Sequence, residues 1–255
     1  MTRFRRLSVA LLAVPVLVLA GCGSGGSGSD QEKTLNVFAA ASLNKTFTDI
    51  GKQFETDNPN WKVKFNFAGS SDLVTQLTQG AKADVFASAD TKNMDKAAHG
   101  GLLAGDPVNS ASNTLLIVTA PGNPRGVASF ADLNKPGLTV VVCAPQVPCG
   151  SATEKVEKAM HVTLNPVSEE SSVTDVLAKV TSGQADAGVV YVTDGIGAGD
   201  KVATVEFPEA SVAVNTYPIA ELKSAADADA AKKFIALVTG EAGQKILSQA
   251  GFAKP

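Results

Sequence analysis

The sequence has little of the chemistry that most hydrolases and metalloproteins need. It contains only two histidines, His99 and His161, and three cysteines in 255 residues. Neither histidine stands in a metal-ligand spacing or beside a nucleophile motif, which disfavours a zinc centre and a catalytic triad. Acidic residues outnumber lysine and arginine, 25 to 22, and the formal net charge of −3 disfavours nucleic acid as a partner.

Long apolar runs are also absent, except for one near the start of the chain. Leu7–Leu19 carries no charge, follows three arginines and is too short to span a bilayer, which is typical of a signal-peptide core. It ends in Leu19-Ala20-Gly21-Cys22, which resembles the bacterial lipobox. We therefore expect residues 1–21 to be a lipoprotein signal peptide and Cys22 to be lipidated; the alternative is an ordinary signal peptide with a chance cysteine.

The segment after Cys22 has the composition of a tether. Residues 23–29 are only glycine and serine, so residues 22–32 are expected to link a membrane anchor to a folded domain. Loss of residues 1–21 would remove three arginines and no acidic residue, which takes the formal charge from −3 to −6. An anion bound by such a chain must be held by local donors against the overall field.

Two cysteines remain in the expected mature chain, Cys143 and Cys149. An even number in an oxidising compartment favours a disulfide, with two free thiols as the alternative. The ring would be short, so its main use would be to stiffen residues 144–148. A Cys-x5-Cys spacing without a nearby histidine is not a usual zinc pattern.

Strand and helix patterns alternate along the rest of the chain, which predicts an α/β fold with mostly parallel strand pairing. The expected strands are residues 34–40, 62–67, 85–88, 114–119, 138–142, 187–191, 202–207 and 212–218. The expected helices are residues 43–57, 72–80, 93–99, 151–160, 173–181, 226–237 and 240–249. Gly195-x-Gly197-x-Gly199 follows no nucleotide-binding pattern, and we interpret it as a loop.

Serine or glycine marks the start of several predicted helices, as at Ser42, Gly69-Ser70, Gly150 and Ser172. Each one alone is an ordinary helix cap. Several helix starts that converge at the carboxyl ends of strands would instead form an anion site, because their backbone N–H groups are free and partly positive.

The motifs at these helix starts resemble those of the molybdate-binding proteins of bacterial ABC-type molybdate transporters. The resemblance covers nearly all of the mature chain in the same order. The matching motifs are Val37-Phe38-Ala39-Ala40-Ala41-Ser42-Leu43, Phe67-Ala68-Gly69-Ser70-Ser71, Ala83-Asp84-Val85-Phe86-Ala87-Ser88-Ala89-Asp90, Val147-Pro148-Cys149-Gly150 and Gly188-Val189-Val190-Tyr191.

The resemblance implies an oxyanion site made of neutral donors. In that family two serine side chains with their backbone amides, two further amides and a tyrosine hydroxyl hold the anion. Carried onto this sequence by motif, these residues are Ser42, Ser70, Cys149, Val173 and Tyr191. Cys149 stands where the family often has alanine, and it contributes only its backbone N–H. No side chain is expected to ligate a metal cation, and no cofactor is implied beyond the ligand, molybdate or tungstate.

The resemblance also implies a type II periplasmic-binding-protein fold, in which two α/β lobes with mixed, mostly parallel sheets enclose a ligand cleft. Lobe 1 is expected to comprise residues 33–112 and 215–255, and lobe 2 residues 113–214. The implied partners are the permease and ATPase of an ABC importer. The chain itself is expected to be a monomer that is anchored through Cys22 to the outer face of the cell membrane.

Three other functions stay open from the residues alone. The first is a binding protein for another tetrahedral oxyanion, such as sulfate or thiosulfate. The second is a secreted hydrolase that uses Ser42 or Ser70, although it would need a histidine base within reach. The third is a lipoprotein that binds other proteins and no small ligand.

Overall fold

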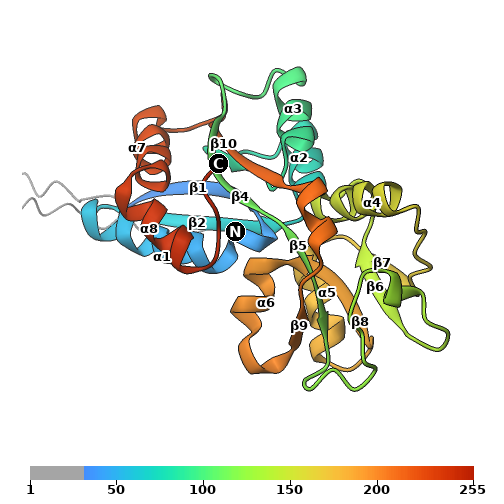
Figure 1. Ribbon diagram of the computed structural model, residues 1–255. Coiled ribbons are helices and arrows are strands. Elements are labelled where there is room, and N and C mark those ends of the chain that lie inside the picture. The colour runs from blue at the N-terminus through green and yellow to red at the C-terminus, as the bar shows by residue number, and fades with distance from the viewer. Residues whose placement is uncertain (1–31) are drawn as a thin grey trace, which may run out of the picture. The chain divides into compact units, whose positions relative to one another are not determined.

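Two five-stranded sheets organise residues 32–255, which are the residues that the computed structural model describes. The predicted signal peptide, the predicted lipidation of Cys22 and nearly all of the predicted tether lie outside the described residues. One sheet belongs to lobe 1 and the other to lobe 2 (Figure 1). The exact boundaries between the lobes, residues 112/113 and 214/215, stay a prediction.

The sheet of lobe 1 has the strand order β2-β1-β3-β10-β4. Its strands are β1 (Lys33–Ala40), β2 (Trp61–Ala68), β3 (Val85–Ala87), β4 (Val108–Asn113) and β10 (Asn215–Glu221). Strand β1 runs parallel to β2 and β3, whereas β10 runs antiparallel to β3 and β4. The register between β10 and β4 shifts between Tyr217 and Pro218, because proline has no N–H to donate to a ladder.

Helices cover both faces of this sheet. They are η1 (Ala41–Leu43), α1 (Asn44–Asp57), α2 (Ser70–Thr78), α3 (Thr91–His99), α7 (Ala228–Thr239) and α8 (Glu241–Gln249). Helices α1, α7 and α8 bury their apolar residues on one face, where Phe234 packs edge-on against Phe47 and Phe54. Helices α2 and α3 cover the other face around Phe86 and Met94.

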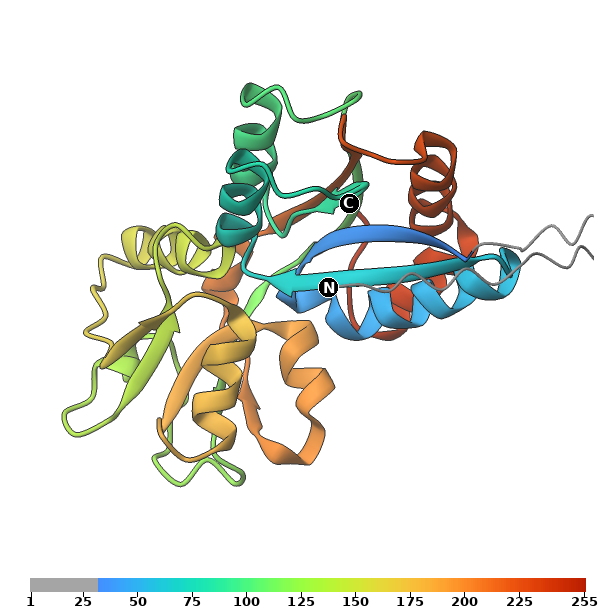
Figure 2. The ribbon, with the colours of Figure 1, turned by 180° about the vertical axis from the view of Figure 1, so that it is seen from behind.

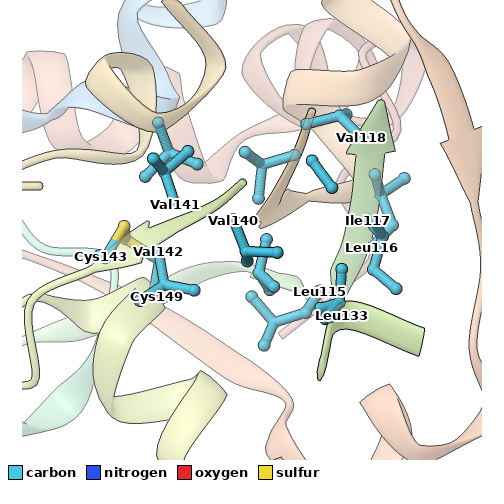
Figure 3. Packing of buried hydrophobic residues seen from close by; sticks show 14 of the residues in the cluster. Leu115, Leu116, Ile117, Val118, Leu133, Val140, Val141, Val142, Cys143 and Cys149 are labelled. Carbon is cyan, nitrogen blue, oxygen red and sulfur yellow. A yellow bond between two sulfur atoms is a disulfide. The ribbon is translucent and has the colours of Figure 1, made fainter. Parts of the chain in front are cut away.

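The sheet of lobe 2 has the order β7-β6-β8-β5-β9. Its strands are β5 (Leu115–Thr119), β6 (Val140–Cys143), β7 (Ser168–Glu170), β8 (Ala187–Tyr191) and β9 (Ala203–Val205). Its helices are η2 (Ala131–Asn134), α4 (Pro148–Met160), α5 (Val173–Thr181), α6 (Val192–Ala198), η3 (Gly199–Lys201) and η4 (Pro208–Ala213). Strands β5 and β6 contribute continuous apolar runs to one core, next to Cys143 and Cys149 (Figure 3).

The chain passes between the lobes twice, and the two passages are paired with each other. Strand β4 ends at Asn113 and β5 begins at Leu115, while the return passage enters β10 at Asn215. Asn113 and Asn215 are direct partners in the β4–β10 ladder. The first and last described elements, β1 in blue and α8 in red, both belong to lobe 1 (Figure 1).

Several elements differ from the sequence-based expectation. The glycine-rich segment expected to be a loop forms the end of helix α6 and, from Gly199, the start of η3. Asp194 stabilises the start of α6 by accepting from the Tyr191 N–H. Strands β4 and β7 were not predicted; β4 is polar and becomes a strand through its tertiary pairing with β10. Residues 208–213 are a 3-10 helix, so β10 begins later than predicted. No helix within residues 32–255 has the length and hydrophobicity of a membrane span.

Candidate oxyanion site

The five residues predicted as oxyanion donors all line one small cavity between the lobes. The remaining lining residues are small or apolar: Ala40, Ala41, Gly69, Ala89, Val147 and Pro148. None of these lining residues carries a charge. The space open to the centre of a water-sized sphere is about 10 Å³, which is close to what one buried water molecule needs. In both ribbon views α4 of lobe 2 lies beside α2 of lobe 1 at this boundary (Figures 1 and 2).

Lobe 1 contributes the two serines at the carboxyl ends of neighbouring parallel strands. Ser42 lies in η1 directly after β1, and Ser70 is the first residue of α2 directly after β2. Strands β1 and β2 are paired in register up to Ala40 and Ala68, so the two connections emerge side by side. Ser70 is buried, and its Oγ accepts a hydrogen bond from the Ala89 N–H at 3.0 Å.

Lobe 2 contributes two helix N-termini. Cys149 is the second residue of α4 and Val173 is the first residue of α5. The first N–H groups of a helix have no partner inside it. In α4 the first N–H with a backbone acceptor is that of Ser151, which donates to Val147 O. In α5 it is that of Asp175, which donates to Ser172 O. The N–H groups of Cys149 and Val173 therefore remain available at the cavity.

Tyr191 closes the cavity from the end of β8. Its side chain is 1% exposed, and burial, reinforced by neighbouring negative groups, raises the pKa of its phenol well above the usual value. The hydroxyl therefore stays protonated and can donate. Its oxygen accepts a hydrogen bond from Asn215 Nδ2 at 3.0 Å.

A second layer of polar side chains lies behind these groups, and the sequence did not reveal it. Tyr217 is fully buried, and its Oη lies 3.1 Å from Ser42 Oγ. Its ring packs edge-on against that of Tyr191, with the centroids 6.0 Å apart. The one available signal was composition, since Tyr191 and Tyr217 are the only two tyrosines in the chain.

The loop between β6 and α4 is closed by a disulfide between Cys143 and Cys149. Close backbone packing adds to this constraint, because a Cβ on Gly150 would overlap the carbonyl group of Ala144. The cavity-facing backbone of Cys149 is thus held from two directions.

Asp194 is an ionisable group close to the site. Its carboxylate accepts from the Tyr191 N–H, and burial raises its pKa to about 7. It also borders a wider cleft of about 440 Å³ on the other side of Ser42, which includes Lys45 and Lys201. That cleft does not bring the predicted donors together, since only Ser42 among them lines it.

The arrangement lacks the parts of a serine hydrolase. His99 ends α3 and His161 follows α4; both are exposed, and neither lines the cavity. Ser42 and Ser70 therefore have no histidine base beside them. Among the described residues there is also no cluster of three or more histidine, cysteine or carboxylate side chains that could hold a metal ion.

Comparison with known proteins gives a consistent picture. Residues 35–253 match the family described as bacterial extracellular solute-binding proteins. The chain is 56% identical over 260 residues, 99% of this chain and 100% of its relative, to the molybdate-binding protein ModA of Mycobacterium tuberculosis.

Solved structures agree with this match. The chain resembles the substrate-binding domain of a putative molybdenum ABC transporter from Clostridium difficile, at 31% identity and a TM-score of 0.65, over 87% of this chain and 99% of that one. It also shares the fold of the Azotobacter vinelandii periplasmic molybdate-binding protein, at 24% identity and a TM-score of 0.75, with the same coverage. These matches confirm the predicted type II binding-protein fold, and the matched family is one of solute-binding proteins rather than enzymes.

Proposed function

Because the chain belongs to the bacterial extracellular solute-binding proteins, and among them to the molybdate-binding proteins of ABC transporters, we propose that it captures molybdate in the cavity between its lobes. The observation that carries the proposal is the meeting of Ser42, Ser70, Cys149, Val173 and Tyr191 around one cavity whose lining residues are uncharged. These residues come from five separate segments.

The donor set suits a tetrahedral dianion. The side chains and free backbone N–H groups described above offer hydrogen-bond donors, and the N-termini of α2, α4 and α5 add partial positive charge. A hydrogen bond to a charged group contributes roughly 1.5–3 kcal/mol. About seven such bonds would outweigh the cost of ordering a small ion, which is several kcal/mol.

The same donors would select among anions. A protonated oxyanion such as hydrogen phosphate brings an O–H group that a wall of donors cannot accept, so its binding is weakened. Sulfate has the charge and shape of molybdate but is smaller, and only the fit of the cavity distinguishes the two. Tungstate is nearly the size of molybdate, and we propose that it binds as well.

Contacts between the lobes support capture by closure. Asn93 of α3 donates from Nδ2 to the carbonyl oxygen of Gln146 in lobe 2, at 3.4 Å. A ligand held by donors from both lobes favours the closed state, because the open state lacks half of those donors. We propose that the closed form, as a monomer anchored through Cys22, delivers the anion to the permease and ATPase of an importer.

Calorimetric titration of the mature chain with molybdate, tungstate, sulfate, thiosulfate and hydrogen phosphate tests this function. We expect molybdate and tungstate to bind one ion per chain and to raise the melting temperature, and the other anions to bind at least tenfold more weakly. Tighter binding of sulfate would replace the proposal with the sulfate alternative. No heat and no thermal shift with any anion would favour a lipoprotein without a small ligand.

Two neighbouring serines offer a matched pair of variants. Ser70 lines the cavity, whereas Ser71 does not line it and its buried Oγ has no hydrogen-bond partner among the described residues. Ser70→Ala should weaken molybdate binding by roughly tenfold or more. Ser71→Ala should leave it unchanged. Equal effects of the two variants would contradict the assignment of the site.

A further inference from the structure

The side-chain amide of Asn215 connects the two lobes directly behind the cavity. Asn215 is the first residue of β10, is 6% exposed, and stands where the chain returns to lobe 1. Its Nδ2 donates to the carbonyl oxygen of Ala89 in lobe 1 at 2.7 Å and to Tyr191 Oη in lobe 2 at 3.0 Å. Both hydrogens of the amide nitrogen are therefore used.

The partners fix which way this amide is turned. A carbonyl oxygen can only accept a hydrogen bond, so the Asn215 atom that faces Ala89 O must be the nitrogen. The same nitrogen then reaches Tyr191, and its hydrogen occupies an acceptor position of the phenolic oxygen. The hydroxyl hydrogen of Tyr191 must point in another direction. There it can reach an acceptor in the cavity that Tyr191 lines, or the hydroxyl oxygen of Tyr217 beside it.

We infer that Asn215 is a positioning residue that turns the Tyr191 hydroxyl into an obligatory donor and thereby sets the preference for a fully deprotonated oxyanion. The inference rests on the proposed function and concerns a residue that does not line the cavity. Asn215 acts on selectivity only through Tyr191 and Ala89.

The same arrangement recurs at Ser70 through the Ala89 segment. The N–H of Ala89 donates to Ser70 Oγ, while the carbonyl oxygen of Ala89 accepts from Asn215. The hydroxyl of Ser70 is thus also supplied with a protein donor, which leaves its own hydrogen for the cavity. Asn215 therefore positions a hydroxyl donor in each lobe, one directly and one through the backbone.

The physical consequence is a site wall with donors and no acceptors at these positions. If Asn215 could not donate, the Tyr191 hydroxyl would be free to turn, and its lone pair could face the cavity. A protonated anion would then find an acceptor for its O–H group. Discrimination between molybdate and hydrogen phosphate should depend on Asn215 even though it does not contact either ion.

The test uses Asn215→Asp, Asn215→Ala, Tyr191→Phe and the double variant Asn215→Asp/Tyr191→Phe in the full mature chain. The carboxylate of Asn215→Asp has the same shape but can only accept, so it would draw the Tyr191 hydrogen away from the cavity. We expect it to weaken molybdate binding by at least 30-fold and to narrow the selectivity over hydrogen phosphate. Asn215→Ala should produce a smaller loss with the same narrowing.

The double variant separates hydrogen-bond direction from charge. A new negative charge would repel the anion with or without the Tyr191 hydroxyl, whereas control of that hydroxyl disappears once it is gone. We therefore expect Asn215→Asp to cost much less in the Tyr191→Phe background, as a non-additive cycle. Asn66→Asp, at a half-buried asparagine of β2 that bonds Gln76, is the control for loss of an amide in the same sheet.

The outcomes distinguish the inference from the function on which it rests. Wild-type chain that fails to bind molybdate contradicts the proposed function. Wild-type binding with fully additive losses in the cycle, or unchanged selectivity in Asn215→Ala, overturns the role of Asn215. Melting temperatures of the ligand-free variants identify any variant that fails to fold. If Asn215→Asp does not fold, the selectivity of Asn215→Ala decides the test.

Discussion

Gly69 of lobe 1 and Ser171 of lobe 2 are in backbone contact across the cleft. A Cβ added to Gly69 would overlap the carbonyl oxygen of Ser171 and would also lie 3.6 Å from Val147 Cγ1. Gly69 is the N-cap of α2, directly before Ser70. The closeness of the two lobes at the site thus depends on the absence of a side chain at one position.

Gly69→Ala should therefore hinder closure more than it disturbs either lobe. Its φ of −58° suits any residue, so the change adds no backbone strain and acts through the clash with Ser171. We expect molybdate affinity to fall about tenfold or more, with little change in the melting temperature of the ligand-free chain. Gly105→Ala is the control, because a Cβ at Gly105 meets nothing within 4 Å; equal affinities in both variants would refute the contact's role.

Tyr217→Phe should weaken binding moderately. The change removes the hydroxyl that lies 3.1 Å from Ser42 Oγ and keeps the ring packed against Tyr191 and Phe252. One neutral hydrogen bond contributes about 1 kcal/mol, so we expect a loss of about fivefold in calorimetry. Ser42→Ala should then cost less affinity in the Tyr217→Phe background than in the wild-type chain. If Ser42→Ala costs the same affinity in both backgrounds, Tyr217 does not act through Ser42.

Loss of the disulfide should lower both stability and affinity. The ring spans a sequence separation of six residues, for which the chain-entropy model gives about 2 kcal/mol. Replacing both cysteines with serine, or reducing the wild-type chain, should lower the free energy of unfolding by about that amount. Affinity should fall only severalfold, because Cys149 contributes a backbone N–H that serine also has. If the free energy of unfolding is the same with and without a reducing agent, the disulfide does not stabilise the chain.

Asp194 should make the ligand-free chain less stable as the pH rises. Its pKa is raised to about 7 on folding, so between about pH 4 and pH 7 the folded state holds a proton that the unfolded state has released. The free energy of unfolding therefore falls across that range. Asp194 is 9% exposed at the rim of the wider cleft. We therefore expect the free energy of unfolding to fall by about 1–3 kcal/mol, which is less than the whole pKa shift would give.

Asp194→Asn should remove this slope and stabilise the chain at pH 8, since the amide oxygen can still accept from the Tyr191 N–H. Denaturant titrations at several pH values measure this pH dependence of the free energy of unfolding. Asp229→Asn, at an exposed position in the first turn of α7, is the control for a simple loss of charge. The same pH dependence in both variants and wild type would assign the effect to another group.

The sequence predicted the elements whose own residues determine them. Helices α1 and α5 have apolar residues at helical spacing, and strands β1 and β8 are short, mostly apolar runs. The bounds of all four were predicted to within one residue. Helix α6 was mistaken for a loop because no helical pattern follows Gly195-x-Gly197-x-Gly199 in the sequence. In the structure a Cβ on Gly195 would lie 2.9 Å from Thr204 Cγ2, so this glycine serves close packing of a helix on the sheet.

The cavity-lining residues were predicted through motifs, and the layer behind them was not. Asn215 is 126 residues from Ala89, and Tyr217 is 175 residues from Ser42. The residues around Asn215 in β10 give no sign that its side chain is buried and bonds two distant residues. An asparagine without such bonds would have the same local sequence pattern. Such roles arise only when the tertiary fold brings the segments together.

The return of the chain into lobe 1 has a consequence for the order of assembly. The core of lobe 1 needs Phe234 of α7 against Phe47 and Phe54, and its sheet needs β10 between β3 and β4. Every strand of the lobe 2 sheet, in contrast, lies between residues 115 and 205. Lobe 2 can therefore complete its sheet and the core that Phe207 and Ala213 join while residues 215–255 are still unstructured. The cavity can form only once that C-terminal segment has arrived.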